Sequence, residues 1–331
     1  MPVVRVVGDG VVECAEGDTV LRAALRAGLG FPYACNTGSC GTCRFQLLEG
    51  AVEHLRADPP AWTERDRERN RWLGCQARPL GDVTVKVRLD PEQVPPHRPV
   101  VMEATLVEVT PITHDLSGFA FELEGPDDFC PGQYALLHLE GVDGARGYSM
   151  ANLPGEGRWW FLIKRVPGGA GTGVLFDRLR PGDRIVIDGP YGNAYLRPDR
   201  PGDLLLVAGG SGLAPIVSIA RSATNEPSLA DREIHLFYGG RQPRDLDIDA
   251  VLATIPGFHD RVTYVAAVSD PPPGWAGPSG FVHAVVRDRL GGRLPGFEAY
   301  FAGPPPMVQA MQRMLCEAGV PMDHLHFDEF L

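Results

Sequence analysis

Long apolar runs are absent from this chain of 331 residues: no stretch of eighteen apolar residues occurs, so no segment is expected to cross a bilayer. The first residues lack the basic start, apolar run and cleavage site of a secretory signal, and we therefore expect a cytoplasmic protein. Positive charge is also scarce, with 31 Lys and Arg against 42 Asp and Glu and a formal net charge of −11. This balance argues against nucleic acid as a partner, because phosphate binding needs clustered cations, and it suits docking onto a basic protein surface.

Three segments with different patterns follow one another along the chain, whose length predicts more than one hydrophobic core. Residues 1–90 combine short strands with a helix and a cysteine cluster, and residues 91–100 form a proline-rich linker. Residues 101–198 contain short β-like runs between turn residues, which predicts an antiparallel β-barrel. Residues 199–331 alternate strands with helices, which predicts an α/β domain with a doubly wound parallel sheet. We therefore expect a multidomain protein.

The first segment opens with apolar residues at alternating positions. They lie in residues 3–7 and 11–14, and the Gly-Asp-Gly sequence between these runs predicts a hairpin. A helix is expected next, with Asp18 as its N-cap and Gly28 at its end. Strands and helix together make this an α+β segment.

Seven cysteines are an odd number, and three of them lie within nine positions. Cys35, Cys40 and Cys43 have the spacing C-x4-C-x2-C, and Cys75 follows 32 positions after the third. This is the spacing of plant-type 2Fe–2S ferredoxins, so we predict a 2Fe–2S cluster in a β-grasp ferredoxin domain. The alternatives are a set of free thiols or a zinc site, although zinc sites prefer paired C-x2-C units and only one is present. The other cysteines are expected to be small buried apolar side chains: Cys14, Cys130 and Cys316.

The second segment carries three fragments that suit a flat anionic ligand: PGQY at 131–134, RGYS at 146–149, and a Gly-rich turn from Pro167 that leads into a helix. Each fragment alone is equally compatible with an ordinary barrel strand or turn. In their order, the fragments resemble those of the ferredoxin–NADP reductase superfamily. This resemblance implies bound FAD. It places Arg146 on the flavin phosphate, Tyr148 against the isoalloxazine ring and Ser149 near the reactive nitrogen of that ring. It also places Ile163 and Lys164 beside the flavin, and Gly168, Gly169 and Thr172 on the pyrophosphate.

In the third segment a buried strand, a Gly-rich turn and a helix beginning near Pro215 form a dinucleotide-binding pattern, although a plain strand–helix turn would look much the same. Two later pieces, at 237–241 and 302–307, fall at the ends of strands that should converge on the same crevice, and both resemble pieces of the same superfamily. Many relatives have cysteine where this chain has Ala302, which argues against a thiol in hydride transfer. The resemblance also places Phe330 over the flavin. The predicted NAD site comprises Gly209, Gly210, Ser211, Gly212, Tyr238, Arg241, Gly303, Pro304 and Met307.

The choice of coenzyme depends on the charge beside the ribose. NADPH requires cations for its 2′-phosphate, and here Arg241 and Arg244 stand close to Asp245 and Asp247. Because the carboxylates weaken a phosphate site, we expect NADH to be preferred to NADPH.

Electron counting predicts the order of the cofactors. NADH delivers two electrons together and a 2Fe–2S cluster accepts one at a time, so the flavin must act between them. No side chain needs to act as a catalytic acid, base or nucleophile, and histidines such as His54, His97 and His114 are expected to be bystanders.

The whole chain resembles the reductase components of bacterial multicomponent oxygenases, of the aromatic and alkene monooxygenase type. The resemblance implies that electrons pass to an oxygenase hydroxylase component or to a Rieske ferredoxin, and we expect a monomer that binds neither nucleic acid nor membrane. Two alternatives remain open: the same modules could serve a deoxysugar dehydratase, or the chain could be a non-catalytic redox carrier or sensor.

Overall fold

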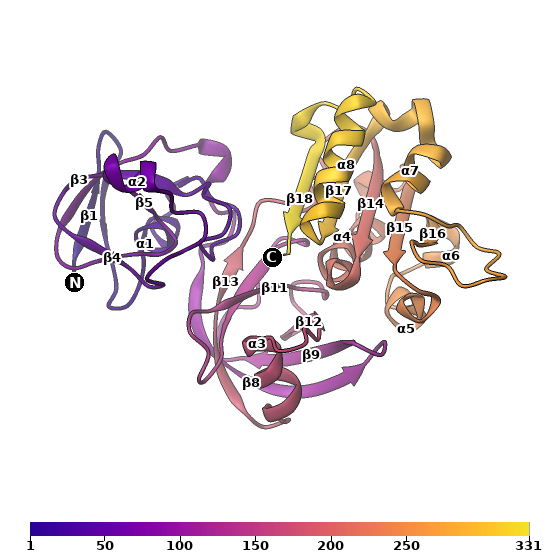
Figure 1. Ribbon diagram of the computed structural model, residues 1–331, viewed down its shortest axis with the longest axis horizontal. Helices are drawn as coiled ribbons and strands as arrows, with labels where there is room; N and C mark the ends of the chain where they lie inside the picture. Colours follow the sequence, from indigo (N-terminus) through magenta and orange to yellow (C-terminus); the bar gives the residue numbers. More distant parts are fainter. Residues whose placement is uncertain (331) are drawn as a thin grey trace. The chain divides into compact units, whose positions relative to one another are not determined.

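The computed structural model describes residues 1–330 (Figure 1). The chain divides into two compact units. Unit 1 comprises Met1–Glu103, Ala135–Gly147 and Ile185–Asn193, and unit 2 comprises Ala104–Tyr134, Tyr148–Arg184 and the C-terminal part from Ala194 onward. No helix among the described residues is both long and apolar enough to cross a membrane.

The N-terminal part of unit 1 is a five-stranded sheet in the order β2-β1-β7-β3-β5. Strands β1 and β7 are parallel, whereas β1–β2 and β3–β7 are antiparallel. Helix α1 buries nearly all of its side chains, as expected of the helix that a β-grasp sheet wraps. The elements are β1 (Val3–Val6), β2 (Gly10–Glu13), α1 (Val20–Arg26), β3 (Arg44–Glu49), β4 (Val52–His54), α2 (Glu64–Glu68), β5 (Arg71–Leu73), β6 (Ala77–Pro79) and β7 (Val83–Lys86), with β4 and β6 as a separate pair.

Helix α1 ends as the sequence indicates but begins differently. Gly28 follows the last turn with φ of +84°, a conformation that glycine adopts without strain. The N-cap is Thr19, whose hydroxyl accepts the Arg22 N–H at 3.3 Å, so the expectation that Asp18 caps the helix is wrong. Asp18 instead accepts the Nε–H of Arg26 at 2.9 Å. Asp18 and Thr19 can both cap a helix, and the ion pair between Asp18 and Arg26, at the far end of α1, selects between them.

The flavin-type sheet has six strands in the order β11-β10-β13-β8-β9-β12. Within unit 2, β9 pairs antiparallel with both β8 and β12. The elements are η1 (Pro91–Gln93), β8 (Val100–Pro111), β9 (Leu116–Leu123), β10 (Tyr134–His138), β11 (Arg146–Ser149), β12 (Arg158–Lys164), α3 (Ala170–Gly173), η2 (Val174–Arg178) and β13 (Arg184–Tyr191).

The nucleotide-type domain in unit 2 has a five-stranded parallel sheet in the order β16-β15-β14-β17-β18, with helices on both faces (Figure 1). Alternate residues of the central strand β14 face opposite ways. Leu204 and Leu206 join the core beneath α4, whereas Leu205 and Val207 join the core beneath α7 and α8. This is the doubly wound arrangement that the strand and helix pattern predicts.

The elements of this domain run from β14 to β18. They are β14 (Asp203–Gly209), η3 (Gly210–Gly212), α4 (Leu213–Asn225), η4 (Pro227–Leu229), β15 (Ile234–Gly240), η5 (Pro243–Leu246), α5 (Asp249–Leu252), α6 (Phe258–Arg261), β16 (Val262–Val268), α7 (Val282–Leu290), η6 (Gly291–Gly296), β17 (Phe297–Gly303), α8 (Pro305–Glu317), η7 (Met322–His324) and β18 (Leu325–Glu329).

Candidate cofactor sites

Four thiols gather at one end of the first sheet, because Cys35 and Cys40 lie in the loop after α1 while Cys43 directly precedes β3 and Cys75 follows β5. The Sγ of Cys35 accepts backbone N–H groups at 3.4–3.5 Å, one of them from Cys40. The Cys40 thiol and these N–H groups lower the pKa of Cys35 to about 5. The Cys75 thiol and N–H likewise lower the pKa of Cys43. One thiol of each neighbouring pair is thus stabilised as a thiolate, the form in which cysteine binds an iron–sulfur cluster, whereas its partner, Cys40 or Cys75, has a raised pKa because it donates to that sulfur.

The thiols form two pairs, Cys35 with Cys40 and Cys43 with Cys75. Among residues 1–330, a single group of three side chains offers ligand atoms that all lie within 4.8 Å of one another, and it contains no cysteine. In a tetrahedral zinc site with bonds of ~2.3 Å, all ligand sulfurs lie within ~4 Å of one another. Two separated pairs instead fit two irons with two thiolates each, so the geometry favours the 2Fe–2S cluster over zinc.

Close packing keeps the thiol loop in place. Gly41 has φ of +77°, and a Cβ there would lie 2.2 Å from Nη1 of Arg44. That Nη1 donates to the Gly41 carbonyl at 2.8 Å, while Nε of Arg44 donates to the buried Asp66 at 3.1 Å. Arg44, the first residue of β3, therefore holds the thiol loop by its guanidinium, and any side chain at position 41 would displace that guanidinium.

The remaining cysteines do not behave alike. Cys14 is 1% exposed, and burial raises its pKa to about 12, as expected of an inert apolar side chain. Cys130 is half-buried, and Cys316 is exposed, so the expectation of burial is wrong for Cys316. On α8 the buried positions are Val308, Met311, Met314 and Leu315, and residue 316 falls on the solvent side of this face.

Strand β11 carries the fragment that suggested a flavin. Nη1 of Arg146 donates to the carbonyls of its own preceding loop, at 2.9 Å to Asp143 and 3.1 Å to Gly144. Ser149 is 3% exposed, and its Oγ has no hydrogen-bond partner among the described residues. Because buried hydroxyls are nearly always paired, an orphan here fits a ligand atom such as a polar atom of the flavin ring.

Strand β12 and the turn after it place the other residues assigned to the flavin. Ile163 is fully buried, and Lys164 extends to Asp115, with Nζ 3.0 Å from the carboxylate. Gly169 stands at the start of α3, preceded by Gly168 with φ of +70°. The Thr172 hydroxyl closes this turn by hydrogen bonds to the Val166 backbone at 3.1 and 3.2 Å, so its contact with a pyrophosphate stays a prediction.

The carboxyl ends of β14 and β17 meet so closely that only glycine fits between them. A Cβ on Gly212 would lie 2.1 Å from the Ala302 carbonyl oxygen, and one on Gly209 would lie 2.6 Å from Sδ of Met307. Nearby, the buried Tyr238 donates its hydroxyl to the Gly210 carbonyl at 3.4 Å. The structure thus brings one group of predicted NAD residues together at the sheet edge: Gly209, Gly210, Ser211, Gly212, Tyr238, Gly303, Pro304 and Met307. This glycine cradle is the kind of edge at which doubly wound sheets bind dinucleotides.

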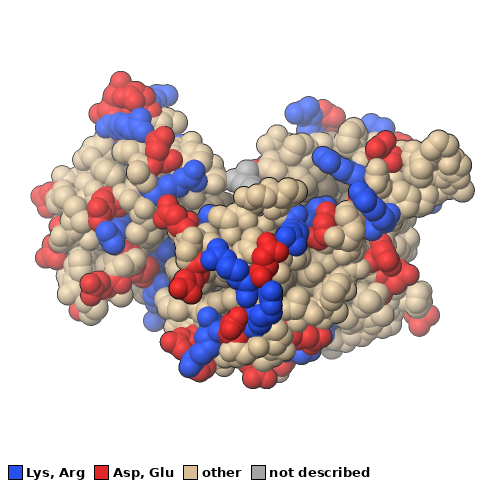
Figure 2. All heavy atoms as spheres, turned by 60° about the horizontal axis from the view of Figure 1, so that its bottom comes forward, with Lys and Arg blue, Asp and Glu red and all other residues tan. Residues whose placement is uncertain are grey.

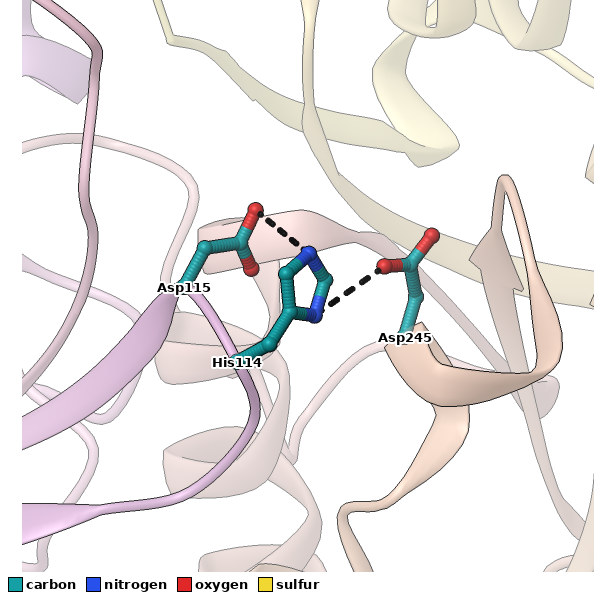
Figure 3. Close-up of side chains that lie close together, drawn as sticks. All are labelled: His114, Asp115 and Asp245. Atoms are coloured by element: carbon teal, nitrogen blue, oxygen red, sulfur yellow. Dashed lines mark ion pairs between the residues drawn. The ribbon is translucent and has the colours of Figure 1, made fainter.

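A histidine between two carboxylates links the turn after β15 to the loop that precedes β9, a contact that the sequence did not reveal (Figure 3). The His114 ring lies between two carboxylates, with Nε2 3.4 Å from Asp115 and Nδ1 3.7 Å from Asp245. Three such groups can hold a metal ion, but the Lys164 ammonium already occupies Asp115 and opposes a cation there. Of the expected NAD residues, Arg241 lies in this turn, where its N–H donates to Asp245 at 2.8 Å.

The end of β18 contains a partly buried acid that the sequence did not reveal. Asp328 is paired with Ala302 in the sheet, and its Oδ2 is shielded from solvent without a hydrogen-bond partner among the described residues. Burial raises its pKa to about 7. Phe330 follows, with its N–H on the Gly303 carbonyl at 3.0 Å and its ring partly buried against the core beneath α4. An acid two residues before Phe330 was the available signal, but only the folded structure shows that its Oδ2 is shielded from solvent.

Replacing Asp328 with asparagine should stabilise the protein more as pH rises. The folded-state pKa is above the unfolded value of 3.8, so ionisation costs folding free energy progressively from about pH 4 to pH 7. We expect Asp328→Asn to gain about 1–2 kcal/mol at pH 8 and almost nothing at pH 4. Thermal unfolding of the holoprotein at both pH values measures this gain, with Glu329→Gln as the control. An equal gain at the two pH values would contradict burial of an ionisable Asp328.

Comparison with known proteins agrees with this division into sites. Models of three domain families match the chain: a 2Fe–2S iron–sulfur cluster binding domain over residues 5–80, an oxidoreductase FAD-binding domain over 103–195, and an oxidoreductase NAD-binding domain over 206–313. Ferredoxin–NAD(P)(+) reductase CarAd of Metapseudomonas resinovorans is 42% identical over 98% of both chains. The chain belongs to the family of ferredoxin–NAD(P)(+) reductases.

Two further comparisons extend over nearly the whole reductase. The reductase component DmpP of phenol 2-monooxygenase from Pseudomonas sp. CF600 is 35% identical over 96% of this chain and 92% of its own. A solved structure described as a ferredoxin reductase in carbazole 1,9a-dioxygenase has a TM-score of 0.91 at 39% identity, covering 100% of this chain and 98% of its own. The three-domain fold and the 2Fe–2S, FAD and NAD(H) cofactors are confirmed, as is the assignment to the oxidoreductases. The individual cofactor contacts stay predictions.

Proposed function

We propose that this reductase carries electrons from NADH through FAD to its 2Fe–2S cluster and delivers them singly to an oxygenase system. The observation that carries the proposal is the presence, in one chain, of the paired thiols and the glycine cradle, with the buried Ser149 on the flavin strand. The relatives support the acceptor, because one is named a ferredoxin reductase and another a phenol monooxygenase reductase component. The acceptor is accordingly either a Rieske ferredoxin or a hydroxylase component.

The residues of the chain bind and position the cofactors and exclude water from them. Bound FAD supplies the chemistry, since it accepts an electron pair and releases electrons one at a time. The glycine cradle lets the nucleotide backbone approach the sheet edge, and the buried Ser149 hydroxyl offers a polar contact to the ring. The N–H groups around Cys35 stabilise negative charge on sulfur and so help set the cluster potential.

The cradle also bears on the alternative of a non-catalytic carrier. A nucleotide site no longer in use would be free to fill with side chains, whereas here Gly212 and Gly209 leave the edge of β14 open beside Ala302 and Met307. This favours a working reductase. We also propose that the protein is monomeric and cytoplasmic.

Asp245 is expected to set the preference for NADH. Its carboxylate accepts the N–H groups of Arg241 and Gln242 at 2.8 and 2.9 Å, so it lies within the turn where the ribose of the coenzyme would rest. A negative charge there repels the 2′-phosphate of NADPH. We predict that Asp245→Asn reduces the ratio of kcat/KM for NADH to that for NADPH about tenfold, equivalent to ~1.4 kcal/mol.

The control for this change is Asp260→Asn on α6, which also removes one charge from the domain. Steady-state ferricyanide reduction with each coenzyme gives the two ratios. If the ratio of kcat/KM for NADH to that for NADPH is unchanged in Asp245→Asn, or falls equally in Asp260→Asn, Asp245 does not discriminate between the two coenzymes.

The acceptor is tested by reconstitution. Purified holoreductase and NADH are mixed anaerobically with a Rieske ferredoxin, or with a diiron hydroxylase component, and reduction of each is followed by its visible or EPR spectrum. We expect reduction of at least one. Rapid reduction of cytochrome c without reduction of either oxygenase protein would show that the chain is an active reductase but that its acceptor is not an oxygenase protein. That result would favour the alternative acceptor, a deoxysugar dehydratase.

A further inference from the structure

The outer face of the ferredoxin sheet is basic, although the chain as a whole carries a net charge of −11. In the central strands, buried side chains alternate with exposed ones. Phe45 and Val85 point toward the core, whereas Gln46 and Lys86 point to solvent. On the exposed side lie five cations, which we call the basic face: Arg5, Arg44, Arg71, Lys86 and Arg88.

Strand register brings these cations together from distant parts of the sequence. Gln46 on β3 is paired with Arg71 on β5 and with Lys86 on β7, so the two cations flank it in one row across the sheet. This row lines a surface hollow of about 490 Å³, and Arg44 and Arg88 line it as well. The sequence alone gives no sign of this row, because Gln46, Arg71 and Lys86 are separated by up to 40 positions.

Most of these charges are uncompensated. Arg44 is paired with Asp66. Among the described residues, no carboxylate forms an ion pair with Arg71, Lys86 or Arg88. Two acids lie on the strands of this sheet: Glu49, at the far end of β3 and bonded to Thr84, and Glu13 on the edge strand β2. On the face drawn in Figure 2, cations and anions lie interspersed.

The basic face adjoins the cluster loop. Arg44 directly follows Cys43, and its guanidinium donates to the Gly41 carbonyl in that loop. Arg71 lies four residues before Cys75, on the strand that leads to the fourth thiol. A partner seated on this face would therefore lie beside the thiols from which electrons leave.

We propose that the basic face is the surface on which the electron acceptor docks, and that the acceptor presents a complementary acidic patch to it. The proposal rests on the proposed function, since it concerns the same exit site. It reverses the expectation from net charge, because a local field near the cluster governs docking more strongly than the total charge. Screening by salt should weaken such docking.

The test uses two haem proteins of opposite charge as acceptors, the acidic cytochrome b5 and the basic cytochrome c, with NADH and the holoenzyme at low ionic strength. The variant Arg71→Glu/Lys86→Glu reverses the two cations that flank Gln46. We expect its second-order rate with cytochrome b5 to fall about tenfold and to lose its salt dependence, while the rate with cytochrome c does not fall.

The matched control is Arg289→Glu/Arg313→Glu, which changes the net charge equally on exposed positions of α7 and α8. Equal loss in the control, or no loss in Arg71→Glu/Lys86→Glu, would overturn the proposal. So would salt-dependent self-association of the wild type that this variant abolishes, since the face would then bind a second copy. NADH-dependent ferricyanide reduction and the EPR signal of the reduced cluster should be unchanged in both variants. If the wild type showed neither NADH-dependent ferricyanide reduction nor the EPR signal of the reduced cluster, the proposed function would be rejected instead.

Discussion

Cys40→Ala is expected to abolish electron delivery to one-electron protein acceptors while NADH still reduces the flavin. Cys40 forms a pair with Cys35, and a cluster cannot complete its iron ligation with the three thiolates that remain. Because loss of groups that merely support a metal ligand costs 10–100-fold, loss of a ligand should reduce cytochrome c turnover by at least about 100-fold. Stopped-flow absorbance of the flavin and steady-state cytochrome c reduction separate the two steps.

The control for Cys40→Ala is Cys316→Ala, which removes an exposed thiol outside the cluster loop and should change neither step. Cytochrome c reduction that persisted undiminished in Cys40→Ala would mean that electrons leave from the flavin directly. The order of cofactors proposed above would then be wrong.

Gly212→Ala is expected to damage the opposite end of the electron path. The added Cβ would meet the Ala302 carbonyl oxygen at 2.1 Å and the Gly303 nitrogen at 2.8 Å, so the turn and the end of β17 must separate. Because misplacement by about 1 Å can cost 10²-fold in rate, we expect the kcat/KM for NADH in ferricyanide reduction to fall by roughly that factor. The flavin and cluster absorbance should remain.

The matched control is Gly292→Ala, a substitution in the same domain where a Cβ meets nothing within 4 Å. It should leave kcat/KM for NADH unchanged. Equal activity of Gly212→Ala and the wild type would show that the glycine cradle does not hold the nucleotide.

The parts of the site that lie within one short segment could be predicted from the sequence. The C-x4-C-x2-C run, the turn after β14 and the end of α1 at Gly28 each depend on residues a few positions apart, where local conformation decides. The cysteine positions also predicted the cofactor, because no other common site needs this spacing. What the spacing could not show is that the thiols form two separated pairs.

The features that could not be predicted arise from contacts between distant segments. Asp18 and Thr19 are both good caps, and Arg26 decides between them. His114 becomes part of a charge network only because the turn containing Asp245 folds beside it, although a histidine without a reaction role was expected. The shielding of the Asp328 Oδ2 likewise depends on the strand with which β18 pairs.

The inversion of local and total charge has the same origin. Composition gave an acidic protein and an expectation of a basic partner. Register between β3, β5 and β7 places Arg71 and Lys86 on either side of Gln46, and this arrangement can be seen only once the sheet is assembled. Net charge therefore does not show where on the surface the cations gather.

Anaerobic stopped-flow mixing of the holoprotein with NADH tests the central claim most directly. We predict that the flavin absorbance bleaches first and that the EPR signal of the reduced 2Fe–2S cluster then appears in the same molecules without any added protein. Absence of flavin bleaching with both NADH and NADPH, or a cluster that stays oxidised beside a reduced flavin, would contradict the account.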